Sequence, residues 1–428
     1  MTQSKRTLVS LGWVASLFFI SAANAQGIFL PAGGAVNRGM GGATTGTAVE
    51  SLGSMYWNPA TINRLETDEM AFGFELVYAD QNLSSAFPLA GQGSTDADTG
   101  VVPVPTISWV HHTKNPDVSI GLGIFGVGGF AINLPADAAN PILSPPQTLG
   151  GVGVGGINSE AQFFQLAPAL SVRLTERLSM AAGPVVGLGK VTVDENIFAP
   201  LNANGTYPRG DGARFHWGLG AQLGFHFVHD CNWEFGVNLK TPVWFEDFRY
   251  HAEDATGLPR TDSIDIDLPM IVSGGLAYRG MEYVLLTADI RYLGYNWADG
   301  LGDPAAYQAD GSVDGLGWKD QFALAIGAEL QLTERIIGRL GYVYASELFD
   351  DENTFFNLAS DLSYRHMPTF GASYRCNDHT TISAAYNYLI SWDSSGRYVL
   401  PGAGSIPGSS VTTDFAGHIL TVGLNARY

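Results

Sequence analysis

Residues 321–332 read QFALAIGAELQL, so large apolar side chains alternate with small or polar ones along the whole stretch. Successive side chains of a β-strand point to opposite faces, and this alternation therefore separates two environments. The final residues, 420–428, repeat the pattern as LTVGLNARY. Many alternating strands of about ten residues are typical of an outer-membrane β-barrel. The sequence thus predicts an all-β fold whose strands face lipid on one side and the barrel interior on the other.

Similar segments divide the rest of the chain into fourteen predicted strands. They cover residues 70–81, 104–113, 116–127, 160–174, 177–193, 213–228, 232–249, 262–278, 282–296, 318–332, 335–349, 363–375, 379–393 and 416–428. Short turns such as 333–334 alternate with long Gly-, Asp- and Pro-rich segments such as 128–159. Short periplasmic turns and long extracellular loops are the rule in these barrels. We therefore expect a 14-stranded antiparallel transmembrane β-barrel over residues 70–428.

The first residues predict export. Lys5 and Arg6 precede an apolar run at residues 8–20, and an Ala-x-Ala site ends at Ala25. This is the pattern of a secretory signal peptide over residues 1–25. The run is shorter than the ~20 residues of a membrane-spanning helix. With the barrel pattern, it indicates the outer membrane of a Gram-negative bacterium, in contact with lipid and lipopolysaccharide.

Composition excludes several functions. The formal net charge is −19, so nucleic-acid binding, which needs a basic surface, is not expected. The histidines are scattered without metal-ligand spacing, and we expect neither a metal nor a cofactor. Cys231 and Cys376 fall in turns on nearly opposite sides of the barrel, about 25 Å apart against a Cα limit of ~7 Å for a disulfide. We expect two free thiols.

Residues 26–69 precede the first predicted strand and are expected to form a plug, or hatch, inside the barrel. The segment is rich in small residues but also carries apolar side chains that need burial. Asn58-Pro59 is a turn or helix-start signal. A disordered periplasmic tail is the alternative that the composition leaves open. The apolar side chains of the segment are Met40, Leu52, Met55, Tyr56, Trp57, Ile62 and Leu65.

Two elements of this segment resemble the FadL family of outer-membrane transporters for long-chain fatty acids and other hydrophobic compounds. The first contains Gly39, Met40, Gly41 and Gly42, and the second reads SMYWNPA, ending in Asn58, Pro59 and Ala60. The resemblance implies a 14-stranded barrel closed by an N-terminal hatch, through which an apolar ligand diffuses passively. It also implies a kink in the third strand that lets the ligand leave sideways into the membrane.

The third predicted strand fits such a lateral gate. Glycines within a strand mark bulges and bends, and this stretch contains Gly121, Gly123, Gly126, Gly128 and Gly129. Packing of a glycine-rich strand against the hatch is the simpler interpretation. The Gly-x-Gly-x-x-Gly match within it is rejected as a nucleotide motif, because no βαβ unit surrounds it.

Candidate ligand contacts follow from polarity and strand parity. The segment 128–159 is a candidate landing site, on the strength of apolar residues that include Phe130, Ile132 and Leu134. Lys240, Arg291 and Arg339 face the interior by parity and could anchor a carboxylate, although pairing with interior acids is the simpler role for each. Whether the ligand is a fatty acid or an aromatic hydrocarbon stays open.

Three other functions fit less well. An outer-membrane enzyme would need a catalytic group, and the sequence has no Gly-x-Ser-x-Gly motif or clustered histidines. A general diffusion porin would not carry the long segment before the first strand. A structural or adhesive barrel would have no apolar pocket. We therefore predict a non-enzymatic, monomeric channel for passive uptake of hydrophobic molecules.

Overall fold

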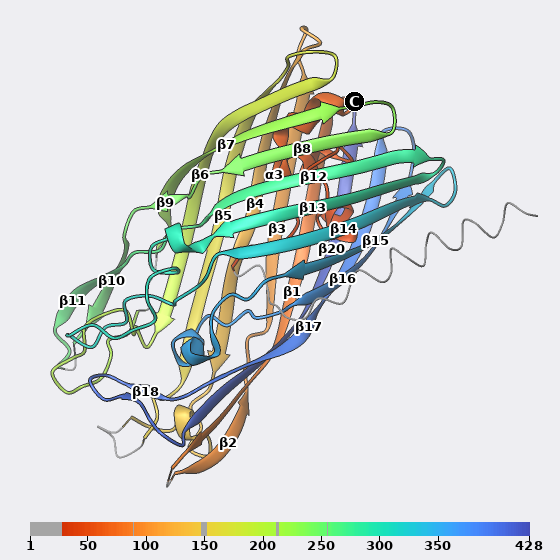
Figure 1. The fold of residues 1–428 in the computed structure, drawn as a ribbon. Helices are drawn as coiled ribbons and strands as arrows, with labels where there is room; N and C mark the ends of the chain where they lie inside the picture. The colour runs from red at the N-terminus through yellow and green to blue at the C-terminus, as the bar shows by residue number, and fades with distance from the viewer. Residues whose placement is uncertain (1–27, 89, 147–151, 211–213, 255) are drawn as a thin grey trace, which may run out of the picture.

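The computed structural model describes residues 28–428 apart from 89, 147–151, 211–213 and 255, so the predicted signal peptide lies outside the described residues. In the described part, fourteen antiparallel strands form a closed barrel, which confirms the predicted fold class (Figure 1). They are β1 (Glu69–Phe87), β3 (Val101–His112), β4 (Val118–Leu134), β5 (Ile157–Arg173), β6 (Leu178–Asp194), β7 (His216–Val228), β8 (Trp233–Lys240), β12 (Met270–Met281), β13 (Val284–Gly294), β14 (Gln321–Gln331), β15 (Ile336–Ala345), β16 (His366–Arg375), β17 (Thr380–Gly396) and β20 (Ser410–Arg427).

The remaining elements beyond the first strand gather at one end of the barrel, which we call the long-loop end (Figure 1). The opposite, short-turn end carries the tight hairpin turns and the C-terminus. The described elements of the long-loop end include two separate two-stranded hairpins, β10–β11 and β18–β19, and three short 3-10 helices. They are β2 (Gly91–Asp96), β9 (Trp244–Phe245), β10 (Phe248–Glu253), β11 (Pro259–Ile264), β18 (Val399–Leu400), β19 (Gly404–Ser405), η3 (Pro141–Leu143), η5 (Tyr295–Trp297) and η6 (Asp351–Asn357).

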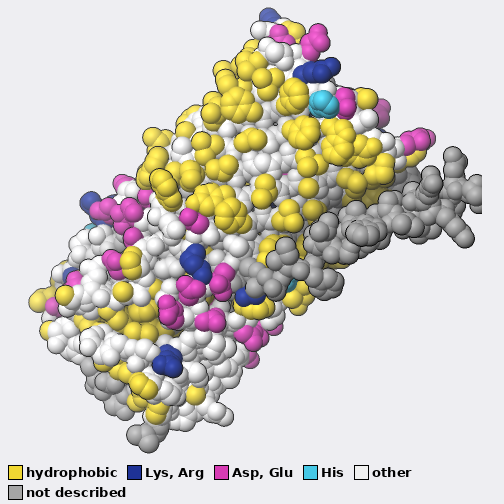
Figure 2. Space-filling model, viewed as in Figure 1, with side chains coloured by type: hydrophobic (Ala, Val, Ile, Leu, Met, Phe, Trp, Pro, Cys, Tyr) yellow, Lys and Arg dark blue, Asp and Glu magenta, His cyan; other side chains and the backbone are white. Residues whose placement is uncertain are grey.

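The alternating faces are confirmed along the strands. In β7, Trp217 is 62% exposed while the neighbouring His216 is buried. In β14, Phe322 is exposed and Gln321 is buried. Hydrophobic side chains form a broad band on the half of the visible face nearest the short-turn end, and charged side chains lie on both sides of this band, at the short-turn rim and toward the long-loop end (Figure 2). The apolar band is thus an outward-facing surface of the kind that lipid covers.

The N-terminal segment lies inside the barrel, where Figure 1 shows it in red behind the strands. It contains α2 (Ala35–Gly39), α3 (Ser51–Trp57) and η2 (Pro59–Arg64), and both α-helices are buried along their whole length. Three inward-facing carboxylates of the wall accept backbone N–H groups from it, which replaces hydrogen bonds that these helix ends and turns lack. The bonds join Gly34 to Glu75, Thr45 to Asp289 and Ser51 to Glu69.

Several predicted strand boundaries are wrong at the long-loop end. The predicted strand 232–249 stops at Lys240, and residues 262–264 belong to β11 rather than to the wall. Pro242 and Pro269 explain both breaks, because proline has no N–H for the ladder. Conversely, β4 continues to Leu134, so the predicted loop 128–159 begins as strand.

Two further observations complete the fold. Among the described residues, no helix is long and apolar enough to cross a membrane. Cys231 and Cys376 are both free, as the geometric argument predicted.

Candidate functional site

The wall of the barrel opens between β3 and β4. These strands pair from His112 and Ser119 up to Thr106 and Phe125, and no pairing continues beyond that point. From there β3 stays paired with β1, and β4 stays paired with β5 as far as Leu134. The two strands therefore separate while each keeps its other neighbour, which leaves a gap in the wall on the side of the long-loop end.

A β-bulge in β4 produces this separation. The register with β5 shifts between Gly126 and Gly128. Before the bulge the odd-numbered side chains Ser119 and Phe125 point inward, whereas after it the even-numbered Ile132 and Leu134 are buried. A bulge inserts one extra residue and bends its strand, so the inward face changes parity and β4 turns away from β3.

The first described residues occupy the inner side of this bend. Phe29 forms an antiparallel bridge with Gly128, and the N–H of Leu30 donates to the carbonyl of Val127 at 2.8 Å. The N–H of Gly129 donates to the carbonyl of Ile28 at 3.2 Å. A Cβ atom at Gly128 would collide with that same carbonyl, so glycine permits the close approach.

Three apolar cavities lead from the long-loop end to the gap. An outer cavity of about 60 Å³ is lined by residues that include Glu195, Tyr307 and Phe355. A middle cavity of about 20 Å³ follows, with Phe198 in its wall. An exit cavity of about 90 Å³ lies at the gap itself and includes Val104.

The three cavities lie in series, and neighbouring cavities share lining residues. Ile197, Phe356 and Ala359 separate the outer cavity from the middle one. Phe130, Ala161 and Phe163 separate the middle cavity from the exit cavity. The middle cavity has room for only one or two water molecules, so a hydrocarbon would have to displace its aromatic walls. We call the three cavities the apolar route.

The predicted gate glycines divide into two groups. Gly126, Gly128 and Gly129 line the exit cavity at the bulge. Gly121 and Gly123 lie in the paired part of β4, away from the gap. There the backbone of Gly121 packs against Met55 and that of Gly123 against Phe125. Gly121 and Gly123 are therefore explained by packing against interior side chains. The other three glycines lie at the bulge, where β4 separates from β3.

The predicted landing residues also fall into two groups, one that lines the apolar route and one that is buried elsewhere. Phe130 is partly exposed and lines two cavities of the apolar route. Ile132 and Leu134 do not form an exposed loop patch, because they lie in β4 and are almost fully buried. They pack in a hydrophobic cluster at the long-loop end with Ile142, Leu143 and aromatic residues of η6. Leu149, a further apolar residue of the predicted landing segment 128–159, lies outside the described residues.

Two of the three candidate carboxylate anchors are already occupied. Arg291 is fully buried, donates to the carbonyls of Pro31 at 3.2 Å and Gly42 at 2.6 Å, and lies 3.3 Å from Asp289. Its guanidinium also stacks 3.7 Å above the ring of Trp57. Arg291 therefore holds the N-terminal segment in the barrel.

Arg339 is likewise paired, with Glu329 at 2.8 Å and with the hydroxyl of Ser373. Lys240 differs, because no carboxylate of the described residues lies within ion-pair distance of its ammonium group. It is 6% exposed and lies 5.0 Å from the ring centre of Tyr56. Lys240 lines none of the three cavities of the apolar route.

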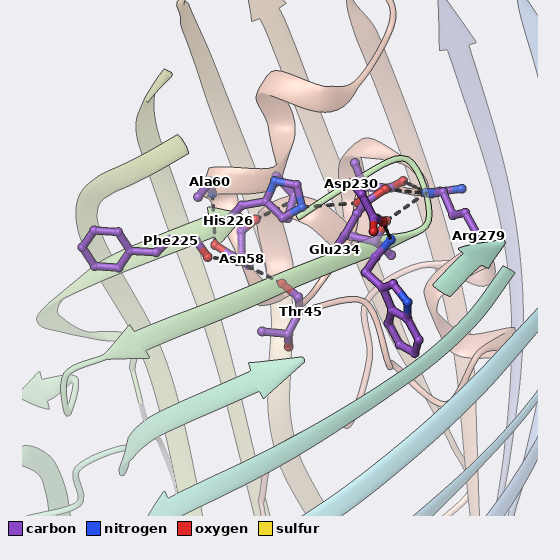
Figure 3. A network of polar contacts seen from close by, with 12 residues as sticks. Thr45, Asn58, Ala60, Phe225, His226, Asp230, Glu234 and Arg279 are labelled. Atoms are coloured by element: carbon purple, nitrogen blue, oxygen red, sulfur yellow. Dashed lines mark hydrogen bonds and ion pairs between the residues drawn. The ribbon is translucent and has the colours of Figure 1, made fainter. Parts of the chain in front are cut away.

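The residues of the N-terminal motifs fix this segment to the wall (Figure 3). Asn58 caps η2 by accepting the N–H of Ala60, and its amide donates to the carbonyls of Thr45 and Phe225, both at 2.9 Å. Pro59 is the first residue of η2, where a missing N–H costs nothing. This confirms the helix-start signal and explains why the chain has an asparagine there.

The glycine-rich motif makes close contacts. Gly39 packs against Gly371 of β16, and the residues around Gly41 approach β15. Gly42 has a φ of 77°, which favours glycine, and a Cβ there would collide with the carbonyl of Pro31. Met40 is fully buried against β13 and its neighbours.

The N-terminal segment contacts the wall at a second place, toward the short-turn end. Glu234 accepts hydrogen bonds from the hydroxyl of Thr47 at 2.7 Å and from Arg279 at 2.9 Å, and His226 lies 3.3 Å from it (Figure 3). Beside it a polar cavity of about 790 Å³ is lined by charged residues such as Arg177 and Asp230. Its lining suits water rather than an apolar ligand.

One carboxyl group of the described cavity walls faces the apolar route from a loop. Glu195 lies just beyond the end of β6, and burial raises its pKa to about 7. The neighbouring Asp194 raises the pKa further, while Arg209 lowers it. At neutral pH the outer cavity therefore carries a partly ionised carboxyl group.

Sequence reasoning missed most residues of the route. Phe163, the adjacent pair Ile197 and Phe198, and Phe356 come from three separate parts of the chain, and only the fold brings them together. A local signal existed for the change of face in β4, since Phe125 has the opposite parity to Ile132 and Leu134. Parity counted on both sides of the glycines would have located the bulge.

Comparisons with known proteins agree with this architecture. Residues 16–428 match the sequence model of the family described as outer membrane protein transport protein (OMPP1/FadL/TodX). No curated protein matches the chain significantly in sequence.

Solved structures resemble the fold at low sequence identity. The Pseudomonas putida toluene transporter TodX superposes with a TM-score of 0.69 at 16% identity, covering 94% of this chain and 100% of that one. The Ralstonia pickettii toluene transporter TbuX superposes with a TM-score of 0.66 at 15% identity, covering 93% of this chain and 99% of that one. A Pseudomonas aeruginosa FadL homologue superposes with a TM-score of 0.68 at 13% identity, covering 94% of this chain and 99% of that one.

Proposed function

Because the chain belongs to the OMPP1/FadL/TodX family of outer membrane transport proteins, we propose that it takes up hydrophobic molecules by passive diffusion through the gap between β3 and β4. Family membership also makes it an outer-membrane protein of a Gram-negative bacterium, and the family consists of transport channels. Ligands enter the apolar route at the long-loop end, which faces the cell exterior, and leave sideways into the membrane.

The observation that carries the proposal is the coincidence of the exit cavity with the break in the wall. The exit cavity is lined on one side by Val102 and Val104 of β3 and on the other by the glycines of the β4 bulge. On the short-turn side of the gap, the barrel is filled by the N-terminal segment, residues 28–65, which is mostly buried and is hydrogen-bonded to the wall. We infer that this segment, within the predicted hatch 26–69, acts as a plug that leaves the lateral gap as the exit.

A reversible disulfide across the gap tests the proposal. A Cβ placed on Gly126 lies 3.7 Å from the Cβ of Val104, which is within the range of disulfides. The test protein carries Val104→Cys and Gly126→Cys, with Cys231 and Cys376 replaced by serine. Oxidation should strap β3 to β4 at the edge of the gap, narrow the exit and lower uptake of labelled hydrocarbon. Reduction should restore it.

A matched disulfide provides the control. His112 and Ser119 are paired across the same two strands at the short-turn end, and their side chains already touch at 2.8 Å. A disulfide in the variant His112→Cys/Ser119→Cys should leave uptake unchanged. Uptake that survives oxidation at the gap, in a folded barrel with the disulfide verified, would rule out the lateral exit.

A non-transporting structural barrel is the alternative that this experiment also addresses. It predicts no uptake above that of cells without the protein, in either redox state.

A further inference from the structure

We propose that the apolar route selects neutral molecules over carboxylates, with Glu195 and Glu160 as the specificity-determining residues at its two ends. This rests on the proposed function and names its substrate class: hydrocarbons and other uncharged apolar compounds, rather than ionised fatty acids.

The charges that line the route carry the proposal. Among the described residues of the three cavity walls, the outer cavity has one charged side chain, Glu195, and the exit cavity has one, Glu160. The middle cavity has none. Both charged groups are acidic, so no lysine or arginine of the described walls faces a molecule along the route.

The neutral polar groups of the route are mostly occupied. The hydroxyl of Tyr207 donates to the carbonyl of Gly311 at 2.6 Å, and that of Ser159 donates to the carbonyl of Ala359. Gln162 donates to Glu160. The hydroxyl of Thr99 in the exit cavity has no partner among the described residues. A single hydroxyl can bind a polar group but does not balance a negative charge.

A carboxylate would therefore meet two unfavourable conditions. It would lose its hydration shell in the cavities without gaining a cation. It would also pass two like charges, which repel it at short range in a low dielectric. Glu160 is partly balanced by Lys190 at 3.8 Å, and beside Glu195 the acidic Asp194 lies 3.8 Å from Arg209. The route therefore presents an acidic group to the ligand at each end.

The interior cations do not offset this barrier. Arg291 and Arg339 already hold carboxylates of the wall, and removing either partner would break a buried pair. Lys240 is the remaining candidate, but the ring of Tyr56 lies against it, and it is not part of the route.

A matched pair of ligands isolates the effect of the carboxylate. Labelled hexadecane and labelled palmitate have the same number of carbon atoms and differ in charge at one end. Uptake is measured at pH 8, where palmitate and Glu195 are both ionised. The host cells lack their own transporter of this type and express the wild-type protein or a variant, with barrel assembly checked by gel mobility.

We expect hexadecane uptake well above that of the empty host, and palmitate uptake at least about tenfold lower. The variant Glu195→Gln should raise palmitate uptake relative to hexadecane uptake in the same cells. The variant Lys240→Met should change neither.

Each other outcome has a distinct meaning. Palmitate uptake equal to or above that of hexadecane would overturn the proposed selectivity while leaving the transport function intact, and its loss in Lys240→Met would assign the anchor to Lys240. Unchanged palmitate uptake in Glu195→Gln would remove Glu195 as a specificity determinant. Uptake of neither ligand by an assembled barrel would contradict the transport function itself.

Discussion

At the scale of single residues, buried charges attach the N-terminal segment to the barrel. Arg291 bonds two backbone carbonyls of this segment, stacks on Trp57 and pairs with Asp289. Asp289 in turn accepts the N–H and the hydroxyl of Thr45. One ion pair thus fixes the segment at four residues, which gives both Arg291 and Asp289 a structural role.

Removing one member of this pair should release the segment. We expect Arg291→Met to lower stability by about 3–5 kcal/mol, because it leaves Asp289 buried without its cation. The measurement is the temperature at which the folded band disappears on a gel, together with the rate at which protease cuts the N-terminal segment. Arg209→Met is the control, since Arg209 is exposed and its pair with Asp194 should contribute less than about 1 kcal/mol. Equal melting of both variants would refute the anchoring role.

At the scale of elements, the bulge in β4 determines where the wall opens and what lines the opening. It separates β4 from β3, changes the face that Ile132 and Leu134 present, and brings Phe130 between two cavities. The route narrows most at the middle cavity, where Phe130 and Ala161 meet. The rate of hydrocarbon uptake should therefore depend on the size of these two side chains.

Opposite substitutions at this constriction should have opposite effects. Phe130→Ala removes a ring from a partly exposed position and should increase the uptake rate for bulky hydrocarbons several-fold. Ala161→Phe adds a ring at a fully buried position and should reduce uptake strongly, with some loss of stability from overpacking. Initial uptake rates for a series of hydrocarbons of increasing width measure both effects. Equal rates in the two variants would show that the constriction does not limit transport.

At the scale of the whole molecule, the barrel has one end with tight turns and a loop-rich end that contains buried or half-buried acids. Burial raises the pKa of Glu195 to about 7 and that of Asp267 to about 6. For an acid with a raised pKa, the stabilising contribution is present below its unfolded-state pKa and is lost as pH rises through the folded-state value. The long-loop end should thus lose stability between about pH 4 and pH 7.

Proteolysis can measure this dependence. We expect the long loops of the intact barrel to be cut faster at pH 8 than at pH 5, after correction for protease activity on an unstructured peptide at each pH. The variant Glu195→Gln/Asp267→Asn should flatten the dependence, because amides do not titrate. Faster cleavage at pH 5 would contradict the assigned direction.

The sequence by itself determined the strands, their faces and the number of passes through the membrane. These features depend on a period of two residues, which is a local property that alternating pairs such as Gln321 and Phe322 already express. The helix start at Asn58-Pro59 was also readable, because a cap acts on its immediate neighbours. The predicted strand boundaries were wrong near Pro242 and Pro269, where the chain leaves the wall for the long-loop end.

Only the tertiary structure decided the gap, the route and the state of the cations. The gap exists because β4 bends away from β3 while it stays paired with β5, and strand pairing is a relation between distant segments. The cavities combine side chains from β4, β5, β6 and η6, which no sequence spacing relates. Parity placed Arg291, Arg339 and Lys240 inside the barrel, but the partner of an inward charge depends on what the closed barrel places opposite it. The local sequence therefore determines which face of the strand a side chain occupies, whereas closure of the barrel determines which residues surround it.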